Sequence, residues 1–296
     1  MQKGSWLHST SFFCGHPPWC ASPRILPWGL IRSDPSSGPA NLGLARIAAR
    51  QGNAQEAVDY YHRAIYGTWP DNPQANRIRT RIELVETLGK LGRKTQAQAE
   101  LLLLTAEMPE DIAVRKQVGR LLLDCGLPSE SAEVFRGIIQ KYPRDGDSYA
   151  GLGRAEPALD NYPAAEAAFK NALHWNPGDL TSRKQLEMIE QILALDPSLR
   201  GLTSLQRYQR SRKLMEVVLG SLSQCITTAS TPIPAPVTEL SDTGRKMLLR
   251  RSRPASYSDA TEANISLAEQ MWKARIDLCG PPSDEWLTRL MARLSK

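Results

Sequence analysis

The chain has 296 residues, of which 41% are hydrophobic and 23% charged, and its formal net charge is +6. This composition is typical of a folded globular chain rather than a disordered one, and no apolar run is long enough to predict a membrane-spanning helix. The charge is uneven, because residues 200–253 hold ten Lys and Arg against three Asp and Glu, a difference of +7. The five cysteines are an odd number and widely spaced, which argues against a disulfide framework.

Residues 1–38 show no periodicity and contain three tryptophans among many prolines. We predict an irregular or disordered arm there. It lacks the continuous apolar core of a signal peptide, which predicts a cytoplasmic protein; export is the alternative if the natural N-terminus is missing. The arm also contains Cys14, His16 and Cys20 in the segment CGHPPWC. These three lack a fourth ligand, so no metal site is expected.

Four similar units follow one another, at about residues 39–73, 78–110, 112–144 and 146–178. In each unit a helix, a short turn and a second helix are predicted, and a proline ends the second helix. One position of the second helix is small in every unit, and the position four residues later is large. The small and large pairs are Ala57 and Tyr61, Ala97 and Leu101, Ser131 and Phe135, and Ala165 and Phe169.

This pattern resembles the tetratricopeptide repeat. The resemblance implies an all-α, right-handed superhelical solenoid of antiparallel helix hairpins, in which small residues allow close helix approach and large ones fill the gaps. A single unit cannot bury its apolar face alone, so the units must stack. Three departures are present, of which the first is Val85 in the second unit, where a small residue is usual. The insertion DNPQAN either lengthens the connection after the first unit or extends the next helix backwards, and Pro157 is predicted to kink the first helix of the fourth unit.

Beyond the repeats, residues 180–225 have helical spacing and are predicted to form capping helices. The Pro- and Thr-rich residues 226–259 are predicted to be a linker. Residues 260–296 are predicted to form a tail of two short helices, which packs either on the solenoid or on the helix ending at Cys225. If the protein is exported, a disulfide between Cys225 and Cys279 would join this tail to the cap.

In the tetratricopeptide-repeat family the first helices line a concave groove, and the resemblance implies which residues would lie there. Arginine recurs at the ninth position of three units, and guanidinium groups bind carboxylates with two hydrogen bonds. This recurrence favours a groove for an acidic or C-terminal peptide segment; a solvated charged face is the alternative. The asparagines of the family's carboxylate clamp are missing, which argues against the binding of chaperone tails. The expected groove residues are Arg46, Arg50, Arg79, Glu86, Lys90, Lys116, Arg120 and Arg154.

The C-terminal third contains a basic cluster. Its charge is typical of binding to nucleic acid or to an anionic membrane surface. Tyr208 is the one aromatic residue within it, so stacking on bases is not supported. The alternative is an exposed charged face and a flexible basic segment without a ligand. The cluster consists of Arg207, Arg210, Arg212, Lys213, Arg245, Lys246, Arg250, Arg251 and Arg253.

The sequence contains no HExxH, GxSxG or P-loop motif, and its histidines are scattered. We therefore expect no enzyme, no cofactor and no metal. The favoured function is a non-catalytic scaffold or adaptor that binds a protein or peptide of unidentified sequence in the groove. One alternative is a nucleic-acid- or anionic-surface-associated protein that uses the basic cluster; compared with a protein or peptide partner, nucleic acid is possible but not favoured. The other is an exported envelope assembly factor that lacks its natural N-terminus.

Overall fold

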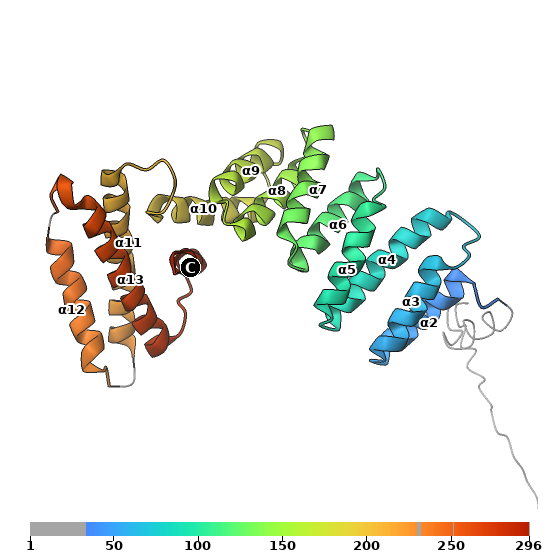
Figure 1. The fold of residues 1–296 in the computed structure, drawn as a ribbon, viewed down its shortest axis with the longest axis horizontal. Helices are drawn as coiled ribbons and strands as arrows, with labels where there is room; N and C mark the ends of the chain where they lie inside the picture. The colour runs from blue at the N-terminus through green and yellow to red at the C-terminus, as the bar shows by residue number, and fades with distance from the viewer. Residues whose placement is uncertain (1–33, 230–231, 251, 296) are drawn as a thin grey trace, which may run out of the picture. The chain divides into compact units, whose positions relative to one another are not determined.

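The computed structural model describes residues 34–229, 232–250 and 252–295, and these ranges contain thirteen α-helices and no strand (Figure 1). The all-α prediction is confirmed. The chain divides into two compact units, Met1–Met108 and Pro109–Lys296. The sequence-predicted arm and its CGHPPWC segment lie outside the described residues, apart from the last residues before the first helix.

The first unit consists of two antiparallel helix hairpins. Its helices are α2 (Gly38–Arg50), α3 (Ala54–Tyr66), α4 (Pro73–Lys90) and α5 (Lys94–Ala106). The turns within the hairpins contain Gly52 and Gly92 at φ of +80° and +70°, a conformation that glycine adopts without steric cost. Helix α4 begins at Pro73, before the predicted start of the second repeat at residue 78, because a proline fits the first helical turn. The insertion therefore extends the helix backwards.

The second unit begins with two further hairpins, and in these the small residues explain how the helices pack. Its first helices are α6 (Ile112–Asp124), α7 (Pro128–Lys141), α8 (Gly146–Ala155) and α9 (Tyr162–Trp175). The ring of Phe135 on α7 is buried between α6 and α8. A Cβ atom would lie 2.8 Å from this ring at Gly119 and 2.3 Å from it at Gly151, so both helices approach the ring more closely than a side chain permits.

Pro157 does more than kink the first helix of the fourth repeat. Helix α8 ends at Ala155, and a 3-10 helix, η1 (Glu156–Leu159), replaces its last turn, since proline lacks the N–H that an α-helix needs. The side chain of Glu156 is buried at this change of geometry. It accepts a hydrogen bond from Arg136 and another, at 2.9 Å, from Asn161. These bonds connect α7 to the turn before α9.

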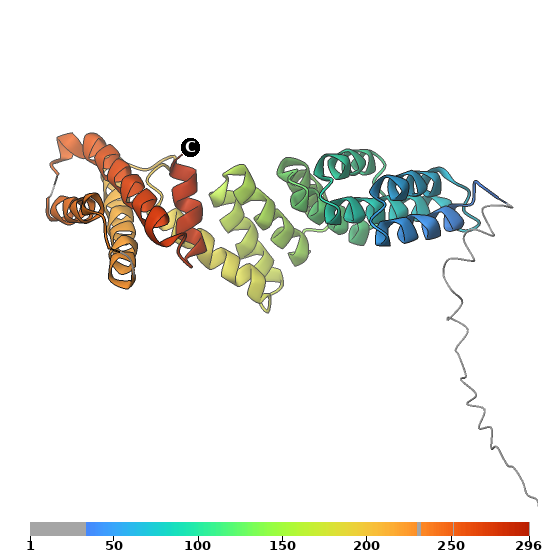
Figure 2. The same cartoon turned by 90° about the horizontal axis from the view of Figure 1, so that it is seen from below.

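The remaining helices of the second unit form one continuous hydrophobic core with α9. They are α10 (Leu180–Leu195), α11 (Ser204–Thr228), α12 (Ala235–Leu249), η2 (Pro254–Ser256), α13 (Tyr257–Cys279) and α14 (Glu285–Leu294). Figures 1 and 2 show α11, α12 and α13 side by side. Helix α14 packs on α10, and Arg293 forms an ion pair at 2.6 Å with the fully buried Asp196. The tail thus contacts both the solenoid end and α11.

Two boundary predictions are wrong. The predicted linker at residues 226–259 is helical over Ala235–Leu249, and α13 begins within it at Tyr257. Proline is accepted in the first turn of a helix, so the Pro-rich run starts α12 instead of interrupting the chain. The predicted tail begins too late, since α13 starts at Tyr257, and with 23 residues this helix is not short.

Candidate protein-interaction surface

In the first unit, Arg46 of the predicted groove binds a carboxylate of its own chain. Its Nε and terminal nitrogen donate to the two carboxylate oxygens of Glu83 at 2.6 and 2.7 Å, and the hydroxyl of Tyr61 also donates to Glu83 at 3.0 Å. Burial alone would raise the pKa of Glu83, but the hydrogen bond and charge of Arg46 outweigh it and hold that pKa below its ordinary value. Burial raises the pKa of Tyr61 to about 12. Arg46 therefore joins α2 to α4.

The other predicted groove residues of this unit lie on the same two first helices. Arg50 and Lys90 are exposed in the last turns of α2 and α4, where a positive charge faces the negative end of the helix dipole. Arg79 donates to the amide oxygen of Asn76 at 2.5 Å. Glu86 is half-buried. Solvent-facing charges near helix ends are thus the main feature here.

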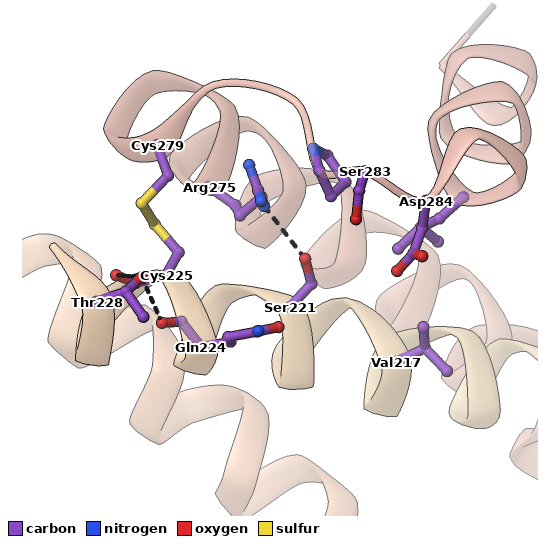
Figure 3. Close-up of a pocket in the computed structure, with 11 residues that line it drawn as sticks. Val217, Ser221, Gln224, Cys225, Thr228, Arg275, Cys279, Ser283 and Asp284 are labelled. Carbon is purple, nitrogen blue, oxygen red and sulfur yellow. Dashed lines mark hydrogen bonds between the residues drawn. A yellow bond between two sulfur atoms is a disulfide. The ribbon is translucent and has the colours of Figure 1, made fainter.

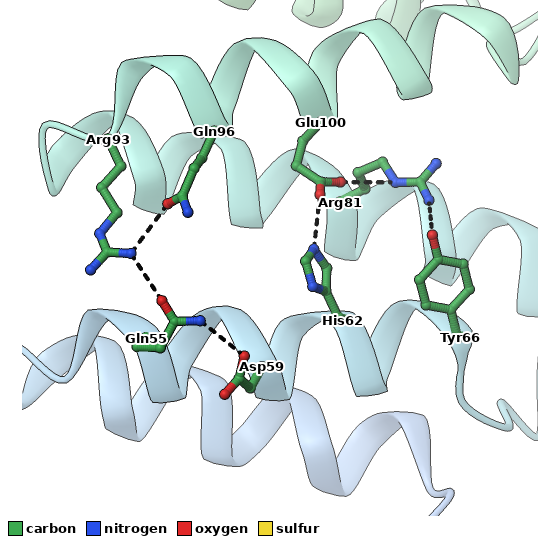
Figure 4. A network of polar contacts seen from close by, with 8 residues as sticks. All are labelled: Gln55, Asp59, His62, Tyr66, Arg81, Arg93, Gln96 and Glu100. Atoms are coloured by element: carbon green, nitrogen blue, oxygen red, sulfur yellow. Dashed lines mark hydrogen bonds and ion pairs between the residues drawn. The ribbon is translucent and has the colours of Figure 1, made fainter.

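A buried charge on α4 was missed by the sequence reasoning. Arg81 is only 5% exposed, and its guanidinium lies 3.4 Å from Glu100 and 3.1 Å from Glu107. It also donates to the hydroxyl of Tyr66 at 3.3 Å, and His62 contacts Glu100 at 2.8 Å (Figure 4). The network connects α3, α4 and α5. Since Arg81 differs from its exposed neighbours only by its position on the helix, no local motif distinguishes it.

In the second unit, Lys116 is also paired within the chain. Its Nζ lies 2.6 Å from Asp145 and 3.2 Å from Asp147, and Asp145 accepts the backbone N–H of Ser148 at the start of α8. Burial would lower the pKa of Lys116, but the hydrogen bonds that its ammonium donates to the two aspartates outweigh burial and raise that pKa. The same pairing, with the bonds from Ser148, holds the pKa of Asp145 below its ordinary value against burial, which would raise it. Lys116 therefore connects α6 to α8.

In the second unit, two arginines of the predicted groove are exposed. Arg120 on α6 and Arg154 on α8 occupy equivalent positions of consecutive repeats, 34 residues apart. Neither lies within ion-pair distance of a carboxylate in the described part of the chain, but the charge of Arg154 acts on Asp179: together with the hydrogen bonds from Ser182, which are the larger cause, it lowers the pKa of that carboxyl. The helices that carry the two arginines are held together by the buried Phe135 and by the Lys116–Asp145 ion pair.

Two members of the predicted basic cluster have structural partners. Arg210 donates to the carbonyl oxygen of Leu193 at 2.6 Å, at the end of α10. Arg212 donates to the carbonyl oxygen of Leu248 at 2.5 Å and to that of Arg250, at the end of α12. The last carbonyl groups of a helix have no intrahelical N–H donor, and a guanidinium can supply the missing donor.

The other members of the basic cluster face solvent or lie outside the described residues. Arg245 lies 3.6 Å from Asp242, one turn away on the same helix. Arg251 falls on a residue that the structure does not describe. The remaining exposed members are Arg207, Lys213, Lys246, Arg250 and Arg253.

Cys225 and Cys279 form a disulfide that joins α11 to the end of α13, as the sequence analysis expected for an exported protein. The bond borders a pocket of about 360 Å³ (Figure 3). Arg275 reaches into this pocket, where its Nε donates to Ser221 at 3.2 Å. Cys125 is buried and takes no part in this disulfide. Among the described residues no group of three His, Cys, Asp or Glu side chains could hold a metal ion.

Comparison with known proteins identifies the repeats. The family model of the tetratricopeptide repeat matches residues 29–73 and 118–179, which include the hairpin α2–α3 and the end of α6 through α9. The solved structure of MamA protein is 13% identical, with alignment over 52% of this chain and 81% of that one and a TM-score of 0.40. A tetratricopeptide repeat protein from Parabacteroides merdae ATCC 43184 is 12% identical over 88% of this chain and 99% of its own, with a TM-score of 0.42. No curated protein matches the sequence.

Proposed function

The chain is a tetratricopeptide-repeat protein, and from this premise we propose that it is a non-catalytic scaffold or adaptor whose first helices bind an acidic segment of a partner protein. Tetratricopeptide repeats generally mediate protein–protein interaction. The finer part of the proposal concerns α6 and α8 in the second unit. Their residues Arg120 and Arg154 are exposed arginines of the predicted groove at equivalent positions of consecutive repeats.

The chemistry of these two side chains supports an acidic ligand. A guanidinium presents two parallel N–H donors that match a carboxylate, and the charge strengthens each hydrogen bond. Arg46 shows this geometry inside the chain, in its two bonds to Glu83. Arg120 and Arg154 offer the same donors to solvent. A partner segment with carboxylates at matching spacing would accept hydrogen bonds from both guanidinium groups.

The surface is also preorganised. Phe135 fills the space against Gly119 and Gly151, and Lys116 ties α6 to the start of α8. A surface whose backbone is already ordered loses less conformational entropy on binding, so more of the contact energy contributes to affinity. This rigidity supports a role in docking rather than in catalysis.

The test is binding of the full chain to an array of acidic peptides, each with a free and an amidated C-terminus. The variant Arg120→Glu/Arg154→Glu should weaken binding by at least about a hundredfold, because each lost charge-assisted contact costs about 1.5–3 kcal/mol. The matched control Lys94→Glu/Lys273→Glu makes the same charge change at exposed positions on α5 and α13 and should leave binding intact. Unchanged binding in the first variant would remove α6 and α8 from consideration.

The disulfide favours a second candidate, an exported assembly factor. Disulfides persist mainly in oxidising compartments, and this one joins two helices of the C-terminal core. Counting free thiols in protein purified from its natural host, under denaturing and non-reducing conditions, tests this candidate. Titration of all five cysteines would exclude the bond and with it the support for export.

A further inference from the structure

The end of the bundle α11–α12–α13 combines an exposed apolar side chain with exposed cations. Leu249, the last residue of α12, is 85% exposed. Lys246 lies three residues before it and Arg250 directly after it, and both are exposed. A single exposed leucine is ordinary on a protein surface, but a leucine at a helix end with cations on both sides is the composition of an interfacial membrane contact.

A second exposed leucine lies at the same end of the bundle. Leu205 is 44% exposed in the first turn of α11, one turn before Tyr208. The hydroxyl of Tyr208 accepts a hydrogen bond at 3.2 Å from the backbone N–H of Ser252, which follows α12. The first turns of α11 and the end of α12 therefore meet. Arg207, also exposed, adds to the positive charge of this end.

This end is held rigidly by internal contacts. Arg212 on α11 donates to two carbonyl oxygens at the end of α12, and the rings of Tyr208 and Tyr257 stack with centroids 4.8 Å apart, which connects α11 to α13. The cations and leucines are thus presented on a fixed surface. No helix in the described ranges has the length and apolarity to traverse a bilayer, so any membrane contact here is peripheral.

A pocket of about 320 Å³ opens between the three helices at this end. Lys246 and Arg250 line it, together with Thr243, Ser252 and Asn264. Ammonium, guanidinium and hydroxyl groups together are suited to the phosphate of a lipid headgroup. The acidic residues nearby are Asp242, which lies 3.6 Å from Arg245, and Glu216, which borders a separate pocket. Asp259 and Glu262 on α13 are exposed and are close in sequence to Ala260, which lines the pocket.

The same charges are less well suited to nucleic acid. Single-stranded nucleic acids bind by stacking bases on exposed aromatic rings, but Tyr208 is only 9% exposed and is stacked on Tyr257. The exposed leucines would contribute nothing to contacts with phosphates and sugars. At a bilayer surface they would enter the headgroup region and add apolar burial to the electrostatic attraction.

We propose that this basic end, formed by Leu205, Arg207, Lys246, Leu249, Arg250 and Arg253, binds the surface of an anionic lipid bilayer. Leu249 enters the headgroup layer, and a lipid phosphate occupies the pocket between Lys246 and Arg250. This activity is separate from peptide binding by α6 and α8, so that the protein would hold a partner at a membrane surface.

The test is co-sedimentation of the full chain with vesicles of phosphatidylcholine that contain about 30% phosphatidylserine, which gives the vesicles a strongly negative surface. Binding should be absent on pure phosphatidylcholine and should weaken as salt is raised. The variant Lys246→Glu/Arg250→Glu should lower the partition coefficient by at least about 25-fold, since each basic side chain near the surface contributes about fivefold. Leu249→Ser should lower it by about tenfold through lost apolar burial.

The control Lys94→Glu/Lys273→Glu should partition as the unmodified chain does, and far-UV circular dichroism should be the same for all variants. Three results would overturn the proposal: equal binding to neutral vesicles, an equal loss of binding in the control variant, or a gel shift with duplex DNA or RNA that depends on Lys246 and Arg250 while vesicles are not bound.

Discussion

Replacing Gly151 by alanine should destabilise the second unit, because α8 contacts the ring of Phe135 without room for a side chain. The added Cβ would lie 2.3 Å from two ring carbons, well inside ordinary van der Waals contact. Movement of the ring is restricted, since α6 is also close to it: a Cβ on Gly119 would lie 2.8 Å from the ring. Overpacking of this kind costs about 1–3 kcal/mol. Because the ring has little room to move, we expect a cost at the upper end of this range, about 3 kcal/mol.

Helix propensity acts in the opposite direction. Alanine is favoured over glycine in a helix by about 1 kcal/mol, so the expected net loss for Gly151→Ala is about 2 kcal/mol. The matched control is Gly137→Ala on α7, two residues from Phe135, where a Cβ would meet nothing within 4 Å. This substitution should stabilise the protein by about 0.5–1 kcal/mol. The two variants carry the same chemical change and differ only in local space.

The measurement is the free energy of opening of α6–α8, from native-state hydrogen exchange resolved by mass spectrometry. A local probe is needed because the chain has two compact units, and a global two-state fit does not apply. Phe135→Leu in the Gly151→Ala background should recover part of the loss, which gives a favourable coupling energy in a double-mutant cycle. Equal stability of Gly151→Ala and Gly137→Ala, or zero coupling with Phe135, would refute this account of the packing.

Three further predictions concern the second unit. Cys225 and Cys279 are 54 residues apart, so reducing their disulfide should cost about 4 kcal/mol in the chain-entropy estimate, seen as a lower melting temperature with dithiothreitol; an unchanged melting curve would contradict a structural bond. Arg212→Met should leave the carbonyls at the end of α12 without a donor and lower the local stability there by about 2 kcal/mol, measured as faster amide exchange, whereas no change would contradict its capping role. The folded-state pKa of Asp145 is below its ordinary value, so the stability it contributes is present above its unfolded pKa and is lost as pH falls through the folded value. Lys116→Met should therefore make acid unfolding less steep below about pH 5, as monitored by circular dichroism, and an unchanged slope would show that the ion pair adds nothing.

The helix hairpins could be predicted from the sequence because their signals are local. Gly52 and Gly92 occupy left-handed turn positions, and the small and large residues of the second helices are buried as their spacing predicts. The error at α12 is also instructive. A segment rich in proline, with Pro234 and Pro236, has the composition of a linker, but proline is compatible with the first turn of a helix. The apolar residues that follow pack on the hydrophobic core, and this packing stabilises α12.

The candidate site was less predictable than the fold. Arg46, Lys116 and Arg120 all appear in the sequence as cations on first helices. Their different states depend on residues distant in the chain: Arg46 meets Glu83, Lys116 meets Asp145, and Arg120 has no such partner in the described chain. Arg212 was grouped with surface charge for the same reason, because the carbonyls that it binds lie 36 and 38 residues away.

The sequence by itself determined the all-α class, the positions of the hairpins and the basic character of the C-terminal third. Each of these depends on residues within one or two helical turns, or on simple counts of charge. Tertiary structure alone decided which charges are neutralised inside the chain and which remain for a partner. Whether two charged side chains meet depends on how helices stack, and stacking is set by packing contacts such as those of Phe135 with Gly119 and Gly151.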